Sequence, residues 1–387
     1  MNKLFLGLVS VFAFLLFTYK ITEVPPGING DEVGIAHNAA LMSKNLTDEN
    51  NNFLPLFVYA KTSDWKQPVT VYTTSAVFKL FGISFTNLRV TSVLFVISSI
   101  IIFYFLCKEV FTLKFFLVGS LILITTPIIM IQSHLALENI AVLPFLFLWL
   151  LMLSKNKKDI HIVLAGMFLG IGIFSYLGMR IIVPVLSLIT LIYLRHNIKK
   201  SLMFLLGVVP FFVLLYVSSF YYPSAVVGSF SSSMPSLDVY LLRYLSIFDV
   251  SFLFIQGDAS PYHSTGKAGM FLISTLPIFL FGVLDILKRK KPLEILILSS
   301  FFLLPALFGF VPDIHRASRL LALVPFYTII STIGFVAIPK KLSAIIILLI
   351  MISYWSFVKD YWFSYPKRVE NIFPATINQY NNEFIKK

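Results

Sequence analysis

Long apolar runs recur along the whole chain, and short polar segments separate them. Each run holds roughly 15 to 20 residues, and a helix of that length crosses about 30 Å of hydrocarbon. The runs are continuous rather than alternating, which excludes a transmembrane β-barrel. The pattern predicts an all-α polytopic membrane protein with about eleven transmembrane helices. These lie near Leu4–Tyr19, Val90–Leu106, Phe115–Ile131, Ile140–Leu153, Ile160–Phe174, Ile181–Leu194, Leu202–Phe220, Met270–Leu287, Leu293–Phe310, Leu320–Ile338 and Leu342–Val358.

Basic residues collect in every second short loop. No small-residue cleavage site follows the first run, so we interpret that run as a retained helix rather than a signal peptide. The alternation of basic loops is typical of the positive-inside rule, and it predicts a cytoplasmic N-terminus. The residues are Lys108, Lys114, Lys155, Lys157, Lys158, Arg195, Lys199, Lys200, Lys288, Arg289, Lys290, Lys291, Lys340 and Lys341.

This orientation places both long connections, about 20–89 and 221–269, on the outer side of the cell membrane. We expect a transmembrane domain over 1–358 and a short outer tail over 359–387. The first outer loop holds two helix-like stretches, Gly34–Lys44 and Thr70–Phe81, and a polar turn lies between them. Long outer loops beside short inner ones predict a protein that works at the outer face.

The composition supports a membrane protein. Of the 387 residues, 58% are hydrophobic and only 13% are charged, whereas soluble domains carry about 25% charge. A water-soluble enzyme is therefore excluded. One cysteine, Cys107, excludes an intrachain disulfide and a Cys-based zinc site. Basic loops explain the net charge of +13 without a nucleic-acid partner.

Acidic residues follow the first predicted span in the segment Pro-Pro-Gly-Ile-Asn-Gly-Asp-Glu, residues 25–32. The two prolines stiffen the chain where it leaves the membrane, and the glycines permit tight turning before a helix. Asn29 and Glu32 have the spacing of a capping box. Asp31 and Glu32 are also candidate catalytic residues, and capping by Glu32 is compatible with catalysis by Asp31.

A second acidic segment, Ser133–Asn139, lies at the outer ends of the third and fourth predicted spans. His134 and Glu138 are four residues apart and would share one face of a helix. A carboxylate this close to hydrocarbon is costly unless it is paired or faces an aqueous cavity. Glu138 is thus a candidate catalytic residue, with an interfacial side chain as the alternative.

Several cations fall on the predicted outer side, where the charge rule disfavours them. They are Lys66, Arg180, His315, Arg316 and Arg319. Arginine suits bidentate phosphate binding, and lysine supplies a point charge for the same purpose. Each alone can be a lipid headgroup contact. Together with the outer carboxylates they indicate an anionic substrate headgroup.

The late outer loop contains Gln256–Gly266, whose Gly, Pro and small polar residues predict a structured turn that could cover a cavity. Its His263 is either a hydrogen-bonding loop residue or a substrate contact. The chain has no HExxH, P-loop or GxSxG motif, so those chemistries lack support.

In order and placement these motifs resemble those of GT-C glycosyltransferases, of the protein O-mannosyltransferase and lipid A aminoarabinose transferase type (glycosyltransferase family 39-like). The resemblance covers most of the chain. The segments that carry it are Pro25–Glu32, Lys66–Pro68, Ser133–Glu138, Tyr176–Arg180, Gly257–Gly266 and His315–Pro325.

The resemblance implies a GT-C fold and transfer of a sugar from a polyprenyl-phosphate donor at the outer face. The transfer would be an inverting, metal-independent single displacement, with no cofactor beyond the lipid-linked sugar. Asp31 matches the first-loop catalytic Asp, Glu138 takes the place of the second acidic residue, and Lys66 matches the Lys that contacts the donor phosphate. The acceptor would be a glycan, a lipid or a protein.

The remaining candidates follow from position. Arg180, Arg316 and Arg319 would join Lys66 at the donor phosphate. Substrate contacts are expected from Trp65, His134, Tyr176, His263 and His315. The rings of Trp65 and Tyr176 could stack on a sugar face, although both can also be interfacial anchors. The chain departs from the family in having His134 where Arg is frequent, and Trp65 and Gln67 around Lys66.

A polytopic transporter or flippase of a lipid-linked or anionic substrate is the alternative from another class. Intramembrane charges can form a transport pathway. The ionisable residues of this chain instead lie at the outer boundary, and no repeat symmetry is evident. These two features favour the enzyme.

Overall fold

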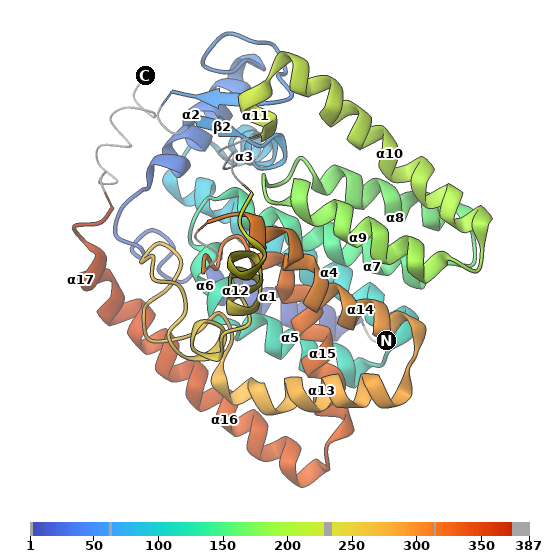
Figure 1. Ribbon diagram of the computed structural model, residues 1–387. Coiled ribbons are helices and arrows are strands. Elements are labelled where there is room, and N and C mark those ends of the chain that lie inside the picture. Colours follow the sequence, from blue (N-terminus) through green and yellow to red (C-terminus); the bar gives the residue numbers. More distant parts are fainter. Residues whose placement is uncertain (1–2, 62–63, 228–233, 313–314, 374–387) are drawn as a thin grey trace.

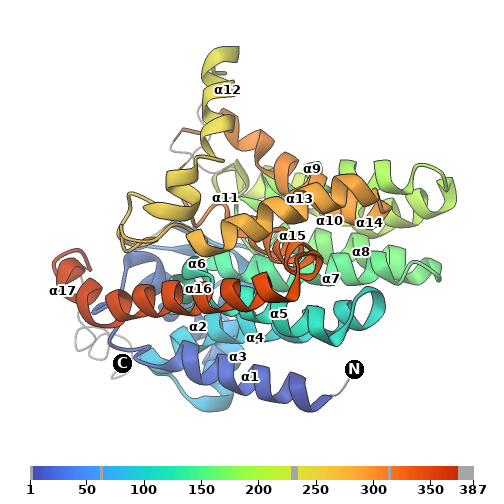
Figure 2. The same ribbon diagram turned by 90° about the horizontal axis from the view of Figure 1, so that it is seen from below.

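The computed structural model describes residues 3–61, 64–227, 234–312 and 315–373. Each predicted apolar run contains a helix within these ranges, although the run that begins at Met270 becomes helical only at Ile273. The helices are α1 (Lys3–Thr18), α4 (Phe85–Val110), α5 (Leu113–Ile124), α6 (Pro127–Ser133), α7 (Val142–Ser154), α8 (Asp159–Gly172), α9 (Met179–Leu194), α10 (Ile198–Tyr221), α13 (Leu276–Arg289), α14 (Pro292–Leu303), α15 (Val324–Ala337) and α16 (Lys340–Lys359). Figure 2 shows these helices running side by side through the body of the molecule.

The third predicted span is not one straight helix. Its two halves, α5 and α6, meet at an angle of 64°. Pro127 opens α6, and Thr126 before it is extended with φ −74° and ψ 117°. A residue that precedes proline is disfavoured in the helical region, so the helix breaks there. The bend directs the chain toward the segment that carries His134 and Glu138.

Four helical segments, Phe85–Val110, Ile198–Tyr221, Pro292–Phe310 and Lys340–Val369, are long and apolar enough to cross a membrane. The bent pair adds a fifth if it forms one span, and five further apolar helices are shorter. The chain is therefore a multi-pass membrane protein. The number of about eleven spans and the orientation of the N-terminus stay predictions.

Close helix packing holds the body together. Helix α8 packs along α10, and α13 packs along α15. Where α13 and α15 meet, Gly282 faces the backbone of Ile330 and Gly334 faces the backbone of Ile278. A β-carbon at either glycine would collide with that backbone. Small residues allow such close approach between helices in a membrane, where dispersion contacts supply most of the attraction.

The first long connection folds into two helices and a hairpin. Helices α2 (Gly30–Asn45) and α3 (Pro68–Phe81) occupy the two stretches expected to be helical. Strands β1 (Val58–Ala60) and β2 (Asp64–Lys66) pair antiparallel, with Val58 opposite Lys66. Strands of three residues are too short for an alternating pattern to reveal. Helix α3 packs against α2 and α4, and thereby fixes the hairpin over the helical body.

The second long connection contains the short helix α11 (Pro223–Val227) and α12 (Leu237–Ser246), which buries none of its residues. Figure 2 shows α12 projecting from the body. Beyond α16 the helix continues through Asp360–Ser364 into α17 (Tyr365–Val369). The expected C-terminal tail is thus helical at its start, and its residues 374–387 lie outside the described part of the chain.

Candidate active site

The start of α2 positions the first candidate residue. The Asn29 side chain accepts hydrogen bonds from the backbone of Asp31 at 2.8 Å and of Glu32 at 3.0 Å. The Asn29 backbone donates in return to Glu32 Oε2 at 3.1 Å. The predicted capping box is therefore present. It fixes the first turn of α2, and with it the direction in which Asp31 and Glu32 leave the helix.

Asp31 forms an ion pair with Lys66. The Lys66 Nζ lies 2.6 Å from Asp31 Oδ1, and the two side chains come from α2 and β2. The Lys66 side chain is 6% exposed, whereas that of Asp31 is 56% exposed. The hairpin thus delivers a buried cation to a carboxylate that remains open to a ligand.

Glu138 stands next to this pair, in the short turn Glu138–Ala141 that precedes α7. Its Oε1 accepts a hydrogen bond from the backbone of Gln67 at 2.5 Å. Burial raises the pKa of Glu138 to about 7, although Lys66, the Gln67 N–H and Arg180 oppose the shift. Asp31 adds to the rise through like-charge repulsion. Glu138 is therefore poised to exchange a proton near neutral pH.

These groups line one small polar cavity of about 210 Å³. It lies between the start of α2, the hairpin, the turn before α7 and the segment after α14. The cavity brings together Asp31 and Glu138 with three of the predicted cations and two predicted substrate contacts. Its lining residues are Asp31, Ile35, Lys66, Leu137, Glu138, Asn139, Tyr176, His263, Arg316, Ser318 and Arg319.

His263 is held in place by two polar side chains, Gln132 and Asn139, to which the sequence analysis gave no role. Asn139 Nδ2 donates to Gln132 Oε1 at 3.0 Å, so the Gln132 amide presents its nitrogen to His263 Nδ1, also at 3.0 Å. Burial lowers the pKa of His263. The Gln132 contact thus fixes the orientation of an imidazole that lines the cavity.

Asp258 connects the late loop to the arginine segment. It is 4% exposed. One of its oxygens accepts from the backbone of Ser260 at 2.8 Å, and the other from Ala317 at 2.7 Å. Ala317 lies between the two cavity arginines, so Asp258 holds them and His263 in one unit. The signal in the sequence was a charged residue inside a loop of Gly, Pro and small polar residues.

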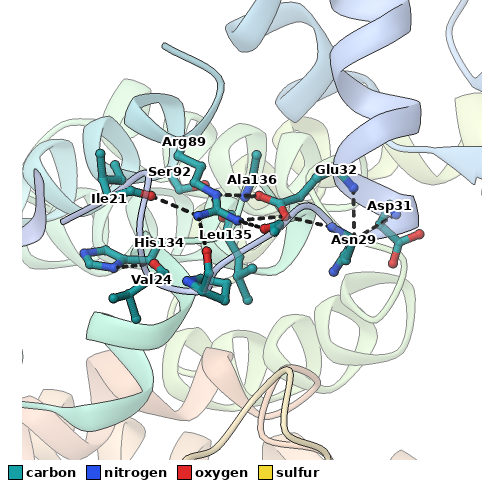
Figure 3. Close-up of polar contacts among 12 residues, drawn as sticks. Ile21, Val24, Asn29, Asp31, Glu32, Arg89, Ser92, His134, Leu135 and Ala136 are labelled. Carbon is teal, nitrogen blue, oxygen red and sulfur yellow. Dashed lines mark hydrogen bonds and ion pairs between the residues drawn. The ribbon is translucent and has the colours of Figure 1, made fainter. Parts of the chain in front are cut away.

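Glu32 does not line the cavity. Figure 3 shows its carboxylate turned toward Arg89, whereas the Asp31 carboxylate points away from that pair. Glu32 Oε1 lies 3.0 Å from Arg89 Nε and accepts from the backbone of Ala136 at 2.9 Å. Both side chains of the ion pair are 0% exposed. The structure therefore encloses Glu32 in the protein rather than at the cavity.

Arg89 was missed by the sequence reasoning because it lies one residue before a predicted span. Its Nη1 donates to the carbonyls of Ile21 at 2.9 Å and Pro25 at 3.1 Å, and its Nη2 donates to the carbonyl of Gly27 at 2.5 Å. These carbonyls belong to the segment that leads from α1 to α2 (Figure 3). A charge at the edge of an apolar run is a usable signal for such a site.

Arg180 braces the cavity wall from outside. Its guanidinium donates to Gln67 Oε1 at 2.8 Å, to the Val226 carbonyl at 2.6 Å and to the Ala225 carbonyl. It also lies over the Phe57 ring, 5.1 Å from the centroid. Gln67 in turn donates its backbone N–H to Glu138. Arg180 therefore acts on the Glu138 carboxylate only through Gln67, which contacts both residues.

The three other predicted substrate contacts also lie outside the cavity. Trp65 Nε1 donates to Ser224 Oγ at 2.9 Å. His134 is buried, and its Nδ1 donates to the Val24 carbonyl at 2.9 Å. His315 hydrogen-bonds the Ser246 carbonyl at 2.7 Å and stacks on Phe252. Each of these side chains contacts protein groups that position a loop.

Among the described residues, no group of three or more His, Cys, Asp or Glu side chains is arranged to hold a metal ion. Metal independence of the reaction stays a prediction.

Comparisons with known proteins bear on this arrangement. The family model described as dolichyl-phosphate-mannose-protein mannosyltransferase matches residues 65–221, less than half of the chain. That range contains Lys66, Glu138, Tyr176 and Arg180. No curated protein sequence matches.

Solved structures share the fold over most of this chain. ArnT from Cupriavidus metallidurans, bound to undecaprenyl phosphate, gives a TM-score of 0.62 at 13% identity, over 90% of this chain and 63% of ArnT. The apo form of the same ArnT also gives a TM-score of 0.62. The oligosaccharyltransferase AglB from Archaeoglobus fulgidus, in complex with an inhibitory peptide and a dolichol-phosphate, gives 0.52 at 14% identity, over 95% of this chain and 56% of AglB. This chain spans less than two thirds of either protein.

The apolar helices, the family match and the shared fold point in the same direction as the order of the sequence motifs. They support the resemblance inferred from those motifs: residues 65–221 are similar to the dolichyl-phosphate-mannose-protein mannosyltransferase family, and most of the chain shares its fold with ArnT and AglB.

Proposed function

We propose that this protein transfers a sugar from a polyprenyl-phosphate donor to an acceptor hydroxyl at the outer face of the membrane. The observation that carries the proposal is the single cavity shared by Asp31, Glu138, Lys66, Arg316 and Arg319. It combines carboxylates that can take a proton with cations that can bind a phosphate. The similarity in fold to ArnT bound to undecaprenyl phosphate supports a lipid-linked donor.

The reaction proceeds as one displacement. The acceptor oxygen bonds to the anomeric carbon of the sugar as the bond from that carbon to the phosphate oxygen breaks. The acceptor proton passes to Asp31, whose carboxylate is half-exposed and held by Lys66. Attack from the face opposite the leaving phosphate inverts the anomeric centre. No metal or other cofactor takes part.

The cations stabilise the charge that develops on the leaving group. The donor phosphodiester carries one negative charge, and the released lipid phosphate gains a second. Arg316 and Arg319 line the cavity beside Lys66, so positive charge is in place where this charge develops. Preorganised charges of this kind are effective because they need little rearrangement during the reaction.

Glu138 contributes a second carboxylate to the same cavity. With its pKa near 7, it is partly ionised at neutral pH. We assign its ionised form the role of accepting a hydrogen bond from a sugar or acceptor hydroxyl. Tyr176 and His263 complete the wall and would contact the sugar. The acceptor is a glycan, lipid or protein that offers a hydroxyl group.

Several expected roles change with the geometry. We assign Glu32 to the support of the α1–α2 connection, because its carboxylate is enclosed with Arg89. We assign Arg180 to positioning of Gln67, and thereby of Glu138, rather than to the donor phosphate. Trp65, His134 and His315 become loop-positioning residues, since none of them lines the cavity.

Reconstituted protein tests the proposal. The protein in lipid vesicles is supplied with a panel of polyprenyl-phosphate sugars and hydroxyl acceptors, and released lipid phosphate is measured. We expect release with at least one donor, and loss of release in Asp31→Asn while donor binding remains. Movement of the donor across the bilayer without lipid phosphate release would favour a flippase. Unchanged release in Asp31→Asn would remove Asp31 from the mechanism.

A further inference from the structure

Two cavities lie at the end of the helical body opposite the candidate active site. Helix α9 begins beside the site at Met179 and ends at Leu194, which corresponds to about 24 Å of helix. One cavity, of about 300 Å³, lies between this end of α9 and the start of α14. The other, of about 470 Å³, lies on the other side of the 288–292 loop, beside α5 and α15.

The larger of these two cavities is balanced in charge. Arg289 lies 2.6 Å from Asp285 and 3.5 Å from Glu294. Lys291 lies 3.7 Å from the same Glu294. All four side chains line this cavity. Its cations are thus engaged with carboxylates, and it offers an anionic ligand no net attraction.

The smaller cavity has cations and no acid in its lining. The basic residues are Arg195, His196 and Lys290. Arg195 Nε donates to His196 Nε2 at 3.0 Å, which fixes the guanidinium while its two terminal nitrogens stay outside this bond. No carboxylate among the described residues forms an ion pair with Arg195 or Lys290. This cavity therefore carries net positive charge at its polar end.

The rest of the smaller cavity is apolar. Its walls include Ile189 and Ile192 from α9, and Ile295 and Leu296 from α14. Ile192 is 52% exposed, so the cavity opens sideways toward the surface that hydrocarbon would cover. A soluble phosphate compound would leave these apolar walls unfilled. A lipid would fill both ends, with its chain between the helices and its headgroup at the basic end.

We propose that this cavity is a binding site for an anionic phospholipid. The lipid phosphate is recognised by the Arg195 guanidinium and the Lys290 ammonium, and one acyl chain lies between α9 and α14. A guanidinium fork and an ammonium are both suited to a phosphate. Because the site is separated from the candidate active site by the length of α9, this proposal does not depend on the proposed transfer reaction.

The test is lipid binding to the purified full-length protein, measured by native mass spectrometry. The probes are phosphatidylglycerol and phosphatidylcholine with identical acyl chains. The test variant is Arg195→Gln/Lys290→Gln. The matched control is Lys291→Gln, which removes a neighbouring cation that belongs to the balanced cavity. All variants are compared only after their thermal midpoints are measured.

We expect one phosphatidylglycerol to remain bound to the unmodified protein and to Lys291→Gln. In the double variant, binding should weaken by roughly thirtyfold, because each basic residue near an anionic lipid contributes about a fivefold factor. Equal binding in the double variant, or equal binding of phosphatidylcholine, would overturn the proposal.

A second variant tests the chain-binding part without any change in charge. Ile295→Trp fills the apolar wall, and it should weaken phosphatidylglycerol binding even though both cations remain. Competition by soluble glycerol phosphate at concentrations comparable to the lipid would show that the apolar walls contribute nothing. That outcome would also contradict the proposal.

Discussion

Asp31 and Glu32 are neighbours in the sequence, but they belong to two different regions of the molecule. The Asp31 side chain is 56% exposed, lines the cavity and contacts Lys66. The Glu32 side chain is 0% exposed and pairs with Arg89. Successive residues of an α-helix point about 100° apart. One turn of α2 therefore directs an exposed carboxylate and an enclosed carboxylate to different sides of the helix.

The two regions also differ in how completely their polar atoms are satisfied by the protein. Glu32 accepts from Arg89, from the Asn29 backbone and from the Ala136 backbone. Asp31 Oδ1 has one ion pair, and the carboxylate is otherwise open to the cavity. A buried charge needs such full pairing, since its desolvation cost is large. The exposed Asp31 carboxylate can still accept hydrogen bonds from a ligand.

The largest effect is expected from Asp31→Asn. Loss of the base should lower the rate of lipid phosphate release about 10²- to 10⁴-fold, the range typical of general acid–base catalysis. The thermal midpoint should fall much less than in Arg89→Met, because Asp31 is half-exposed and the amide oxygen of Asn can still accept a hydrogen bond from the buried Lys66. Glu23→Gln is a suitable control, since Glu23 is also an exposed acid and contacts only Lys20 among the described ion pairs. A large loss of stability in Asp31→Asn would erase the contrast with Glu32.

The opposite side of the contrast is tested by Arg89→Met. This change leaves the Glu32 charge buried without its partner, and breaking such a pair costs about 3–5 kcal/mol. We expect a marked fall in the thermal unfolding midpoint. The double variant Arg89→Met/Glu32→Gln should recover part of that loss, because the unpaired charge is gone. If the double variant is as unstable as the sum of both single variants, the pair is not coupled.

A smaller effect is expected at the cavity arginines. Arg316→Gln and Arg319→Gln should each lower turnover roughly tenfold through weaker stabilisation of the leaving phosphate. Lys267→Gln removes a cation of the late loop that pairs with Asp360 and does not line the cavity. It should leave turnover unchanged. Equal losses in all three variants would indicate a general effect of surface charge rather than a phosphate site.

Most of the helices and part of the candidate active site could be predicted from the sequence, because both leave patterns within short stretches of the chain. Continuous apolar runs predicted the helices, and each of the runs contains one. Motif order pointed to Asp31, Lys66 and Glu138, which share the cavity. The bend between α5 and α6 was a local signal that was not used, since Pro127 marks it.

The rest depended on contacts between distant segments. Arg89 and Glu32 are 57 residues apart in the chain, and nothing near Arg89 indicates its partner. Trp65 was expected at the substrate because its aromatic ring could stack on a sugar face. In the hairpin Trp65 and Lys66 are successive strand residues, whose side chains point to opposite faces. The strands of this hairpin are too short to predict from the sequence. The opposite directions of the Trp65 and Lys66 side chains could therefore not be predicted either.

The smallest effect, and the most specific, concerns the pH dependence of Glu138. Its pKa is about 7 in the folded protein, above the 4.5 of an unperturbed Glu. The folded state therefore binds more protons than the unfolded state between these values, and stability falls as pH rises through that window. Glu138→Gln removes this penalty, while its amide oxygen can still accept from the Gln67 N–H.

Glu138→Gln should thus be more stable than the unmodified protein at pH 8, with little difference at pH 4. The unmodified enzyme should gain activity as pH rises through about 7, because the ionised carboxylate is the form that accepts a substrate hydrogen bond. The variant should lack this step. Thermal midpoints and lipid phosphate release across pH 4–9 measure both. A retained step in the variant would assign the ionisation to another group, and Glu138 would then share the enclosed, structural character of Glu32 rather than the open one of Asp31.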